Sequence, residues 1–482
     1  MPAKSEQSQA QATAGLSNRA LCAAFVAAAV AALLPRGSVS LESANVFTSL
    51  MSIVAIAAAT QAPARQRTDM VFRIALAILV AMALMIVLQS SRLPWTGLAN
   101  PAWPEANAVS GRSGATISVA PADTMTALVS LAGPFITFMA GLLLCHSDER
   151  AETMFRRLAI AAGFLAALSL AQHLAFPGYL LLAEKQFYLG QFTAVFVNRN
   201  TAATFLGLAT ILLTGLLWKS AQEGAPAGLL TRLADGKAAR GRRGTGQFVL
   251  LLGLAATAFI GLTLTQSRAG IASSLIALLF LLAYPAATGL DLARYRFSTP
   301  NRRAGSRLVA IAAVIAGLVA IGLTFAGQTM LRTELSGLDD DRFCTATAIV
   351  DALSDYPVAG MGFGTFEAGF PAYRRAECSI RGVWDRAHNF YLEGQLGLGL
   401  IFPIGLILAV GVLFKSFVTG LRERRKARIY PAVGIAIVIL ALLHSAFDFS
   451  LQLPGLSMFL AAVLAPLVSI SLGRPRRSGA VD

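Results

Sequence analysis

The stretch DRAHNFYLEGQLGLG, residues 385–399, places a histidine beside an asparagine and then continues into a glycine-spaced apolar segment. His388 attracts attention because an unperturbed imidazole titrates at about pH 6.5 and is mostly neutral at neutral pH. A neutral imidazole can take the proton of a hydroxyl group, which is general-base chemistry. The alternative interpretation is a structural histidine at a helix start that hydrogen-bonds a loop carbonyl.

Three arginines stand where apolar segments begin or end. Arg268, in QSRAG, lies between two apolar segments with almost no loop, where a charge is costly unless it is used. Arg199 begins another such segment in the NRN triplet, and Arg342 opens a long polar stretch. A guanidinium binds phosphate bidentately and stays charged, so these residues are candidates for holding a phosphate group. The alternative for each is an interfacial arginine that reaches toward lipid headgroups.

The elements that must position these groups are membrane spans. Of the 482 residues, 56% are hydrophobic and only 13% are charged, whereas soluble domains are about a quarter charged. Apolar stretches long enough to cross a bilayer recur along the whole chain. The net charge of +15 fits basic loops beside anionic headgroups, and no base-reading motif accompanies it, so we do not expect nucleic acid as a partner.

The predicted fold class is an all-α polytopic integral membrane protein with about twelve transmembrane helices and one large structured periplasmic loop between the ninth and tenth. The spans are expected near residues 20–34, 44–62, 70–89, 123–145, 157–176, 201–218, 248–266, 269–290, 308–326, 394–414, 429–446 and 455–472. The first is short and alanine-rich, and the alternative interpretation is a cleaved signal segment.

Basic runs orient these spans. KAARGRR at 237–243, ARYRFSTPNRRAGSR at 293–307 and RERRKAR at 422–428 would all be cytoplasmic, which predicts both termini in the cytoplasm of a bacterial inner membrane. The expected division is a cytoplasmic tail over 1–19, nine spans over 20–326, a periplasmic catalytic loop over 327–393, three spans over 394–472 and a cytoplasmic tail over 473–482.

The periplasmic loop has three recognisable parts. Apolar residues over 343–353 have helical spacing. DYPVAGMGFGTF at 355–366 is a turn-rich strip whose glycines, Gly362 and Gly364 among them, would let the backbone approach a ligand closely. Two interpretations stay open for the interleaved aromatic residues, an interfacial belt or stacking platforms for sugar rings; these residues are Phe363, Phe366, Phe370, Tyr373 and Trp384.

The cysteines agree with this layout. Cys344 and Cys378 share the loop, and an oxidising periplasm would let them form a disulfide. The alternative is a pair of buried free thiols. Cys22 and Cys145 lie in or beside spans and are interpreted as small apolar residues.

Four motifs in order resemble the O-antigen ligase family, which includes related O-antigen and exopolysaccharide polymerases. They are FVNRNTAATFLG at 196–207, TQSRAG at 265–270, DYPVAGMGFGTF at 355–366 and HNFYLEGQLGLG at 388–399. The family pattern of His-Asn, nine residues and Gly fits His388, Asn389 and Gly399. The small residue or tyrosine expected three positions further on is Phe402 here, a departure that bears on ligase versus polymerase.

The resemblance implies glycan transfer from an undecaprenyl-diphosphate donor to an acceptor hydroxyl, with no cofactor and no metal. It implies that Arg268 and Arg342 hold the diphosphate, and Arg199 is added here from its position. His388 would be the general base. Asn389 would orient it or bind a sugar. An acidic triplet at 339–341 would otherwise suggest a metal on the diphosphate, but a solvated turn that caps the next helix is preferred.

Asp448 follows His444 by one helical turn near the outer end of the eleventh span. It is expected either to pair with that histidine or to support an arginine of the site.

The function expected is therefore a ligase-type transferase whose partners are the lipid-linked glycan, a glycan or lipid A–core acceptor, and membrane lipids. The alternatives are a repeat-unit polymerase, a transporter or flippase, and a non-catalytic assembly subunit. Intramembrane acidic residues, which proton or sodium coupling needs, are scarce.

Overall fold

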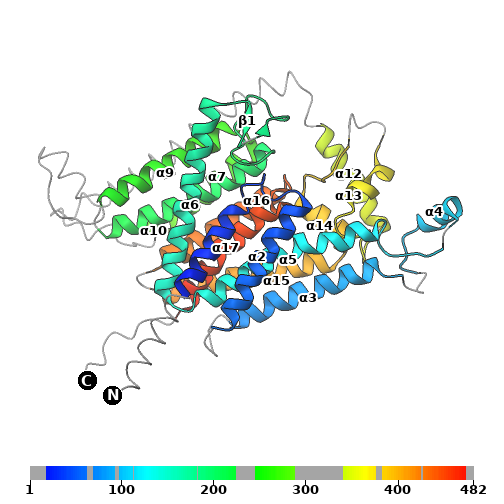
Figure 1. Cartoon of the computed structure of the whole chain (residues 1–482), viewed down its shortest axis with the longest axis horizontal. Coiled ribbons are helices and arrows are strands. Elements are labelled where there is room, and N and C mark those ends of the chain that lie inside the picture. The colour runs from blue at the N-terminus through cyan, green and yellow to red at the C-terminus, as the bar shows by residue number, and fades with distance from the viewer. Residues whose placement is uncertain are drawn as a thin grey trace, which may run out of the picture. The chain divides into compact units, whose positions relative to one another are not determined.

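The computed structural model describes residues 18–61, 69–92, 97–111, 113–181, 183–223, 245–287, 340–375, 383–424 and 427–473, without the side chains of 285–287 and 340–344. Over these residues the chain is helical, apart from one short hairpin (Figure 1). Its strands, β1 (Tyr179–Leu180) and β2 (Ala183–Glu184), pair antiparallel with Tyr179 opposite Glu184.

Apart from the short additions Trp103–Ser110 and Phe366–Gly369, the helices follow the predicted apolar runs. The first is Asn18–Ala31, and the others are α2 (Leu41–Ala59), α3 (Asp69–Ser90), α4 (Trp103–Ser110), α5 (Pro121–Leu144), α6 (Asp148–Ala175), α7 (Arg199–Gln222), α9 (Thr245–Leu264), α10 (Arg268–Ala287), α12 (Asp340–Asp355), α13 (Phe366–Gly369), α14 (Phe390–Leu398), α15 (Ile401–Glu423), α16 (Ile429–Ser445) and α17 (Pro454–Leu472), with short 3₁₀ turns η1 (Phe370–Tyr373) and η2 (Ser450–Gln452).

Within the described residues, eight helices are long and apolar enough to cross a membrane, and three shorter apolar helices accompany them. The chain is therefore a multi-pass membrane protein. Large apolar side chains that remain exposed, such as Ile56 on α2, Leu84 on α3 and Ile407 on α15, are the kind that lipid covers. The span predicted near 308–326 lies outside the described residues.

One predicted span differs from the structure. The apolar run expected to cross the membrane over 394–414 is two helices, α14 and α15, separated at Gly399. Gly399 has φ +65° and ψ −150°, a backbone conformation open essentially to glycine alone. A Cβ there would overlap the Val358 carbonyl, so the break is also a close packing point. The spanning helix begins at Ile401.

The contacts divide the chain into two compact units. Unit 1 comprises residues 1–150, 333–415 and 445–469, and unit 2 comprises 151–332, 416–444 and 470–482. Within unit 1, α5 packs against both α2 and α3, and the three run alongside one another in Figure 1. We call the end of unit 1 at which α3 ends and α5, α15 and α17 begin the loop end.

Gln89 joins three segments at the loop end of unit 1. Its buried side-chain amide donates to the carbonyls of Ala359 and Gly397, both at 2.7 Å, and accepts from the Phe363 amide at 3.1 Å. Residues 355–366, which we call the glycine strip, also bond α14 directly, because Met361 N–H donates to the Leu396 carbonyl at 2.8 Å. A buried polar group must be satisfied, and here that requirement fixes the glycine strip against the end of α14.

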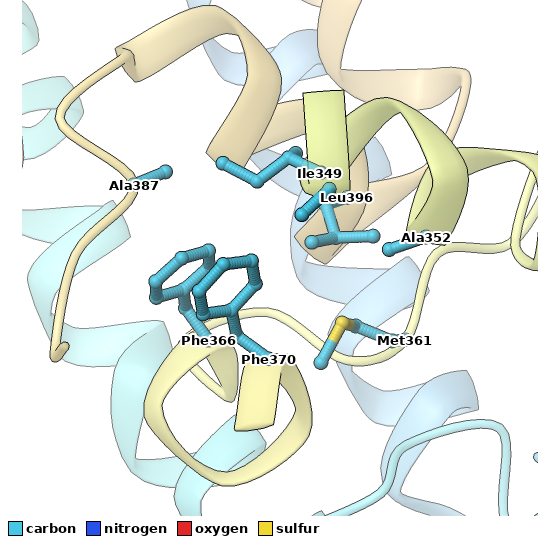
Figure 2. Close-up of a cluster of buried hydrophobic side chains, with 8 residues drawn as sticks. Ile349, Ala352, Met361, Phe366, Phe370, Ala387 and Leu396 are labelled. Atoms are coloured by element: carbon cyan, nitrogen blue, oxygen red, sulfur yellow. The ribbon is translucent and has the colours of Figure 1, made fainter. Parts of the chain in front are cut away.

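A hydrophobic cluster supports the loop end (Figure 2). It combines Ile349 and Ala352 of α12 with Met361, Leu396 and two phenylalanines. Phe366 and Phe370 stack on each other with ring centroids 4.7 Å apart and an interplanar angle of 14°. Both phenylalanines are buried, so the sequence expectation of an interfacial belt or a sugar platform is wrong for these two residues. The helix expected over 343–353 is confirmed as α12.

In unit 2, α7 packs against α9 and α10. Nearly every residue of α7 is buried, which is typical of a helix that is hydrophobic all round. Its contacts use small residues, since a Cβ at Gly207 would meet Ser274 of α10 and one at Gly261 of α9 would lie 3.3 Å from Leu206 of α7. Close backbone approach of this kind is the usual way in which membrane helices associate.

Candidate active site

His388 adopts a left-handed backbone conformation, with φ +53°. This conformation is uncommon outside glycine and is found at sites where the surrounding structure enforces it. Its ring lies edge-on between Trp384, at a centroid distance of 5.5 Å, and Phe449, at 5.0 Å. The imidazole is half-buried, with 26% of its side chain exposed, so a substrate hydroxyl can reach it.

The side chain of Asn389 fixes the backbone directly after the histidine. Its side-chain oxygen caps α14 by accepting from the amides of Tyr391 and Leu392 at 3.0 and 3.1 Å. Its amide nitrogen donates to the Ala446 carbonyl at 3.0 Å. The side chain is thus occupied as a helix cap and a tether. This favours the orienting role over the sugar-binding role that the sequence left open.

Asp448 approaches His388, a partner that the sequence analysis did not consider. Its Oδ1 lies 4.0 Å from the His388 Nδ1, and its side chain is fully buried. The Ser450 hydroxyl donates to the other carboxylate oxygen. A distance of 4.0 Å is an ion-pair contact rather than a hydrogen bond, but such contacts often shorten when substrate binds. The carboxylate is placed to stabilise an imidazolium.

Gly362 and Gly364 pack against the start of α5. They have φ +112° and +79°, and a Cβ at the first would lie 2.8 Å from the Thr124 hydroxyl. A Cβ at Gly364 would lie 2.6 Å from the Ala127 Cβ. The close approach for which these glycines are needed is therefore to the protein itself, and both also line the groove described below.

Glu393 is a buried carboxylate in the first turn of α14. Its Oε2 accepts the Ala387 amide at 2.6 Å, and its Oε1 lies 3.8 Å from the Arg386 guanidinium. Burial raises the pKa of this carboxyl, while Arg386 and the Ala387 amide act in the opposite direction. We call residues 385–389 the histidine loop. It is held on both sides of His388, because Glu393 bonds the Ala387 amide before it and the Asn389 side chain is fixed after it.

An apolar groove of about 900 Å³ lies in unit 1. Membrane helices α2, α3, α5, α15 and α17 supply most of its lining. Its charged lining residues come from the loop end and are Asp123, Glu367, Arg386 and Glu393. A long apolar cleft with a charged end suits an amphipathic molecule whose hydrocarbon lies among the helices.

Unit 2 carries two of the predicted arginines, each as the first residue of a helix. Arg199 begins α7 and Arg268 begins α10. The two helix starts are tied together, because the Ser267 hydroxyl donates to the Asn200 side-chain oxygen at 2.8 Å. Amide groups at helix N-termini favour anions, and two arginines beside them add to that preference. Each helix start is therefore a candidate site for an anion such as a phosphate.

His444 belongs to the packing beneath these helix starts. Its Nδ1 lies 2.6 Å from the Thr204 hydroxyl of α7, and its Nε2 would lie 3.4 Å from a Cβ at Gly270 of α10. The residue is almost fully buried. Thr204 is thus one partner of His444, and the pairing with Asp448 that the sequence suggested stays a prediction.

Several predicted residues lie outside the description. The backbone of Arg342 and Cys344 is in α12, but their side chains are not described, and neither is Cys378. The disulfide and the third arginine thus stay predictions. The role of the acidic triplet at 339–341 also stays a prediction, since residue 339 and the side chains of 340 and 341 are not described. Among the side chains that are described, no group of three His, Cys, Asp or Glu residues could hold a metal ion.

Residues 253–402 match the protein family described as O-antigen ligase. We call this matched segment the O-antigen ligase domain. A search of curated proteins found no match. The resemblance drawn from the motifs is confirmed, and the O-antigen ligase domain includes three of the four, leaving 196–207 outside it. Arg268 and His388 both lie within the domain.

Two residues that hold the site were missed by sequence reasoning. Gln89 lies outside the O-antigen ligase domain and looks like an ordinary polar residue at the end of a span. Glu393 lies inside it, one turn after the His-Asn pair. Its position near a helix start was a usable signal, because an acidic residue there often bonds a nearby backbone amide.

Proposed function

We propose that the protein transfers a glycan from an undecaprenyl-diphosphate donor to an acceptor hydroxyl at the periplasmic face of the inner membrane, as an O-antigen ligase does. The observation that carries the proposal is His388 itself. It stands inside the O-antigen ligase domain, in an enforced left-handed conformation beside a buried carboxylate. Its partly exposed side chain makes it accessible, and Asp448 would stabilise the charge it gains.

The chemistry assigns a role to each group. His388 takes the acceptor hydroxyl proton as the acceptor oxygen bonds to the anomeric carbon of the donor sugar. The bond from that carbon to the diphosphate oxygen breaks, and the electron pair leaves with the diphosphate. Arg268, Arg199 and Arg342 stabilise the negative charge that grows on the leaving group, the kind of interaction that contributes most to many enzymatic rates.

The groove of unit 1 supports a lipid-borne substrate. Its walls are membrane helices, and its charged end lies where Arg386 and Glu393 adjoin the histidine loop. We assign this groove to the hydrocarbon chain of a lipid-linked glycan. No metal ligand and no cofactor is part of the proposal.

A repeat-unit polymerase is the second candidate, and Phe402 favours it. The O-antigen ligase pattern expects a small residue or tyrosine here. The Phe402 ring instead packs on Phe390, with centroids 5.3 Å apart, and fills the space above Gly394. Deletion of the gene separates the two functions: loss of a ligase leaves lipid-linked polymer without its acceptor, and loss of a polymerase leaves single repeats.

The proposal is tested by transfer in proteoliposomes. The donor probe is undecaprenyl-diphosphate-linked glycan extracted from a strain that lacks this protein, and vesicles of that strain supply the acceptor. We expect the wild type to release undecaprenyl diphosphate and to attach or extend glycan. His388→Ala should lower kcat by about 10²-fold or more, because general-base catalysis contributes about that much.

His146→Ala is the matched control, since His146 lies at the opposite end of α5 from the loop end. It should behave as the wild type does. Donor that is moved across the membrane without release of undecaprenyl diphosphate would indicate a transporter and end the proposal. Full transfer by a folded His388→Ala protein would remove the histidine from the mechanism.

A further inference from the structure

The segment before His388 is anchored by its side chains as well as by its backbone. The Ala387 methyl group is buried in the hydrophobic cluster with Ile349 and Leu396 (Figure 2). The Ala387 amide, in contrast, is polar, and an amide buried next to apolar groups needs a hydrogen-bond acceptor. Glu393 supplies that acceptor at 2.6 Å.

The backbone at His388 needs such support. A residue with a side chain is disfavoured in the left-handed conformation relative to right-handed backbone. Asn389, the residue after His388, is held by its capping bonds to α14 and by its bond to the Ala446 carbonyl. Ala387, the residue before His388, is held by the bond from its amide to Glu393. Removal of either anchor would let the loop relax toward a cheaper backbone conformation and carry the imidazole away from Asp448.

We propose that Glu393 is a positioning residue, which sets the imidazole of His388 through the Ala387 amide without touching the reacting atoms. This rests on the proposed function, in which His388 is the base. Its raised pKa is compatible with the role, because a carboxyl group accepts an amide N–H in either protonation state. What matters is an acceptor oxygen at that point, so a neutral glutamine should serve.

Two substitutions separate the acceptor from the charge. Glu393→Gln keeps an oxygen acceptor and removes the charge, and Glu393→Met keeps the length and removes the acceptor. We expect Glu393→Gln to transfer glycan at close to the wild-type rate. We expect Glu393→Met to lose about 10²-fold in kcat with little change in KM for the donor, because a displacement of about 1 Å costs roughly that factor.

Hydrogen exchange gives a readout that a general loss of stability would not reproduce. In the peptide over 383–389, the Ala387 amide should exchange faster in Glu393→Met than in Glu393→Gln or the wild type. Glu105→Met is the matched control. Glu105 is an exposed acidic residue in the first turn of α4, and its loss should change neither kcat nor exchange in this peptide.

The outcomes divide cleanly. Failure of the wild type to transfer, or full activity of His388→Ala, overturns the proposed function and not the structural role of Glu393. With those two behaving as expected, full activity of Glu393→Met overturns the inference, and so does a loss of kcat without faster exchange at Ala387. If Glu393→Met is not recovered folded, Glu393→Gln decides alone: wild-type kcat supports the inference, and a loss as large as that of His388→Ala overturns it.

Discussion

At the scale of single residues, the imidazole of His388 is supported by groups with different tasks. Trp384 and Phe449 confine the ring, and Asp448 lies 4.0 Å from it. A buried carboxylate is expensive unless it is satisfied, and Ser450 satisfies one oxygen. The other oxygen lies nearest the histidine, where its negative charge would attract an imidazolium formed during the proposed reaction.

Asp448→Asn should therefore lower kcat by roughly 10²-fold, with KM nearly unchanged, because the stabilisation is needed only once the histidine is charged. The measurement is steady-state transfer in proteoliposomes. Asp351→Asn is the control, since Asp351 pairs with Arg375 on the exposed side of α12. A rise in KM with kcat intact would contradict this role for Asp448.

At the scale of elements, the loop end depends on bonds between segments distant in sequence. Gln89 in α3 reaches partners 270 and 308 residues further along the chain. These bonds fix the glycine strip and the end of α14 together, and α14 carries both Asn389 at its start and Glu393 in its first turn. The stability of this region and the geometry of the histidine loop are therefore linked.

Gln89→Met should destabilise the protein by about 1–3 kcal/mol for each buried partner that is left unsatisfied. Thermal unfolding in detergent should show a lower Tm, and kcat should fall as well. Ser91→Ala is the comparison, because the Ser91 hydroxyl bonds only the carbonyl of Val87 one turn earlier among the bonds described here. Equal Tm values for Gln89→Met and the wild type would refute this view of the loop end.

Most of the elements were predictable, and most of the bonds between them were not. Hydropathy located the long apolar helices among the described residues, apart from the run over 394–414, and helical spacing located α12, because both signals are local. The break at Gly399 was missed, since the residues on both sides are apolar and only the backbone conformation ends the helix. The contact of Asp448 with His388 was missed for a related reason: sequence spacing suggested only His444, and the contact with His388 depends on the tertiary fold.

At the scale of the whole molecule, the residues of the proposed reaction belong to different units. Unit 1 holds the histidine loop and the apolar groove, and unit 2 holds the arginines at the starts of α7 and α10. Each set rests on its own internal bonds, Glu393 with Ala387 in one and Ser267 with Asn200 in the other. Substitutions of groove residues on the membrane helices, away from the loop end, should therefore change substrate affinity without altering the groups proposed to do the chemistry.

Ala409→Trp would fill part of the groove along α15. If it displaces about two CH₂ groups, at about 0.8 kcal/mol each, KM for the lipid-linked glycan should rise about tenfold with kcat preserved. The comparison is Ile407→Trp on the same helix, whose position is exposed and outside the groove lining. Donors with shortened polyprenyl chains should be less affected by Ala409→Trp, and equal sensitivity at all chain lengths would argue against the groove as the lipid site.

The reach of Gln89 has a consequence for biosynthesis. Helix α3 is translated and inserted long before the ribosome makes the carbonyls of Ala359 and Gly397 that its side chain will bond. Until then an amide that ends up buried must find water or a temporary partner. Closure of such a long loop comes late in folding, so an interrupted or truncated nascent chain would insert its early helices and yet never assemble a competent catalytic centre.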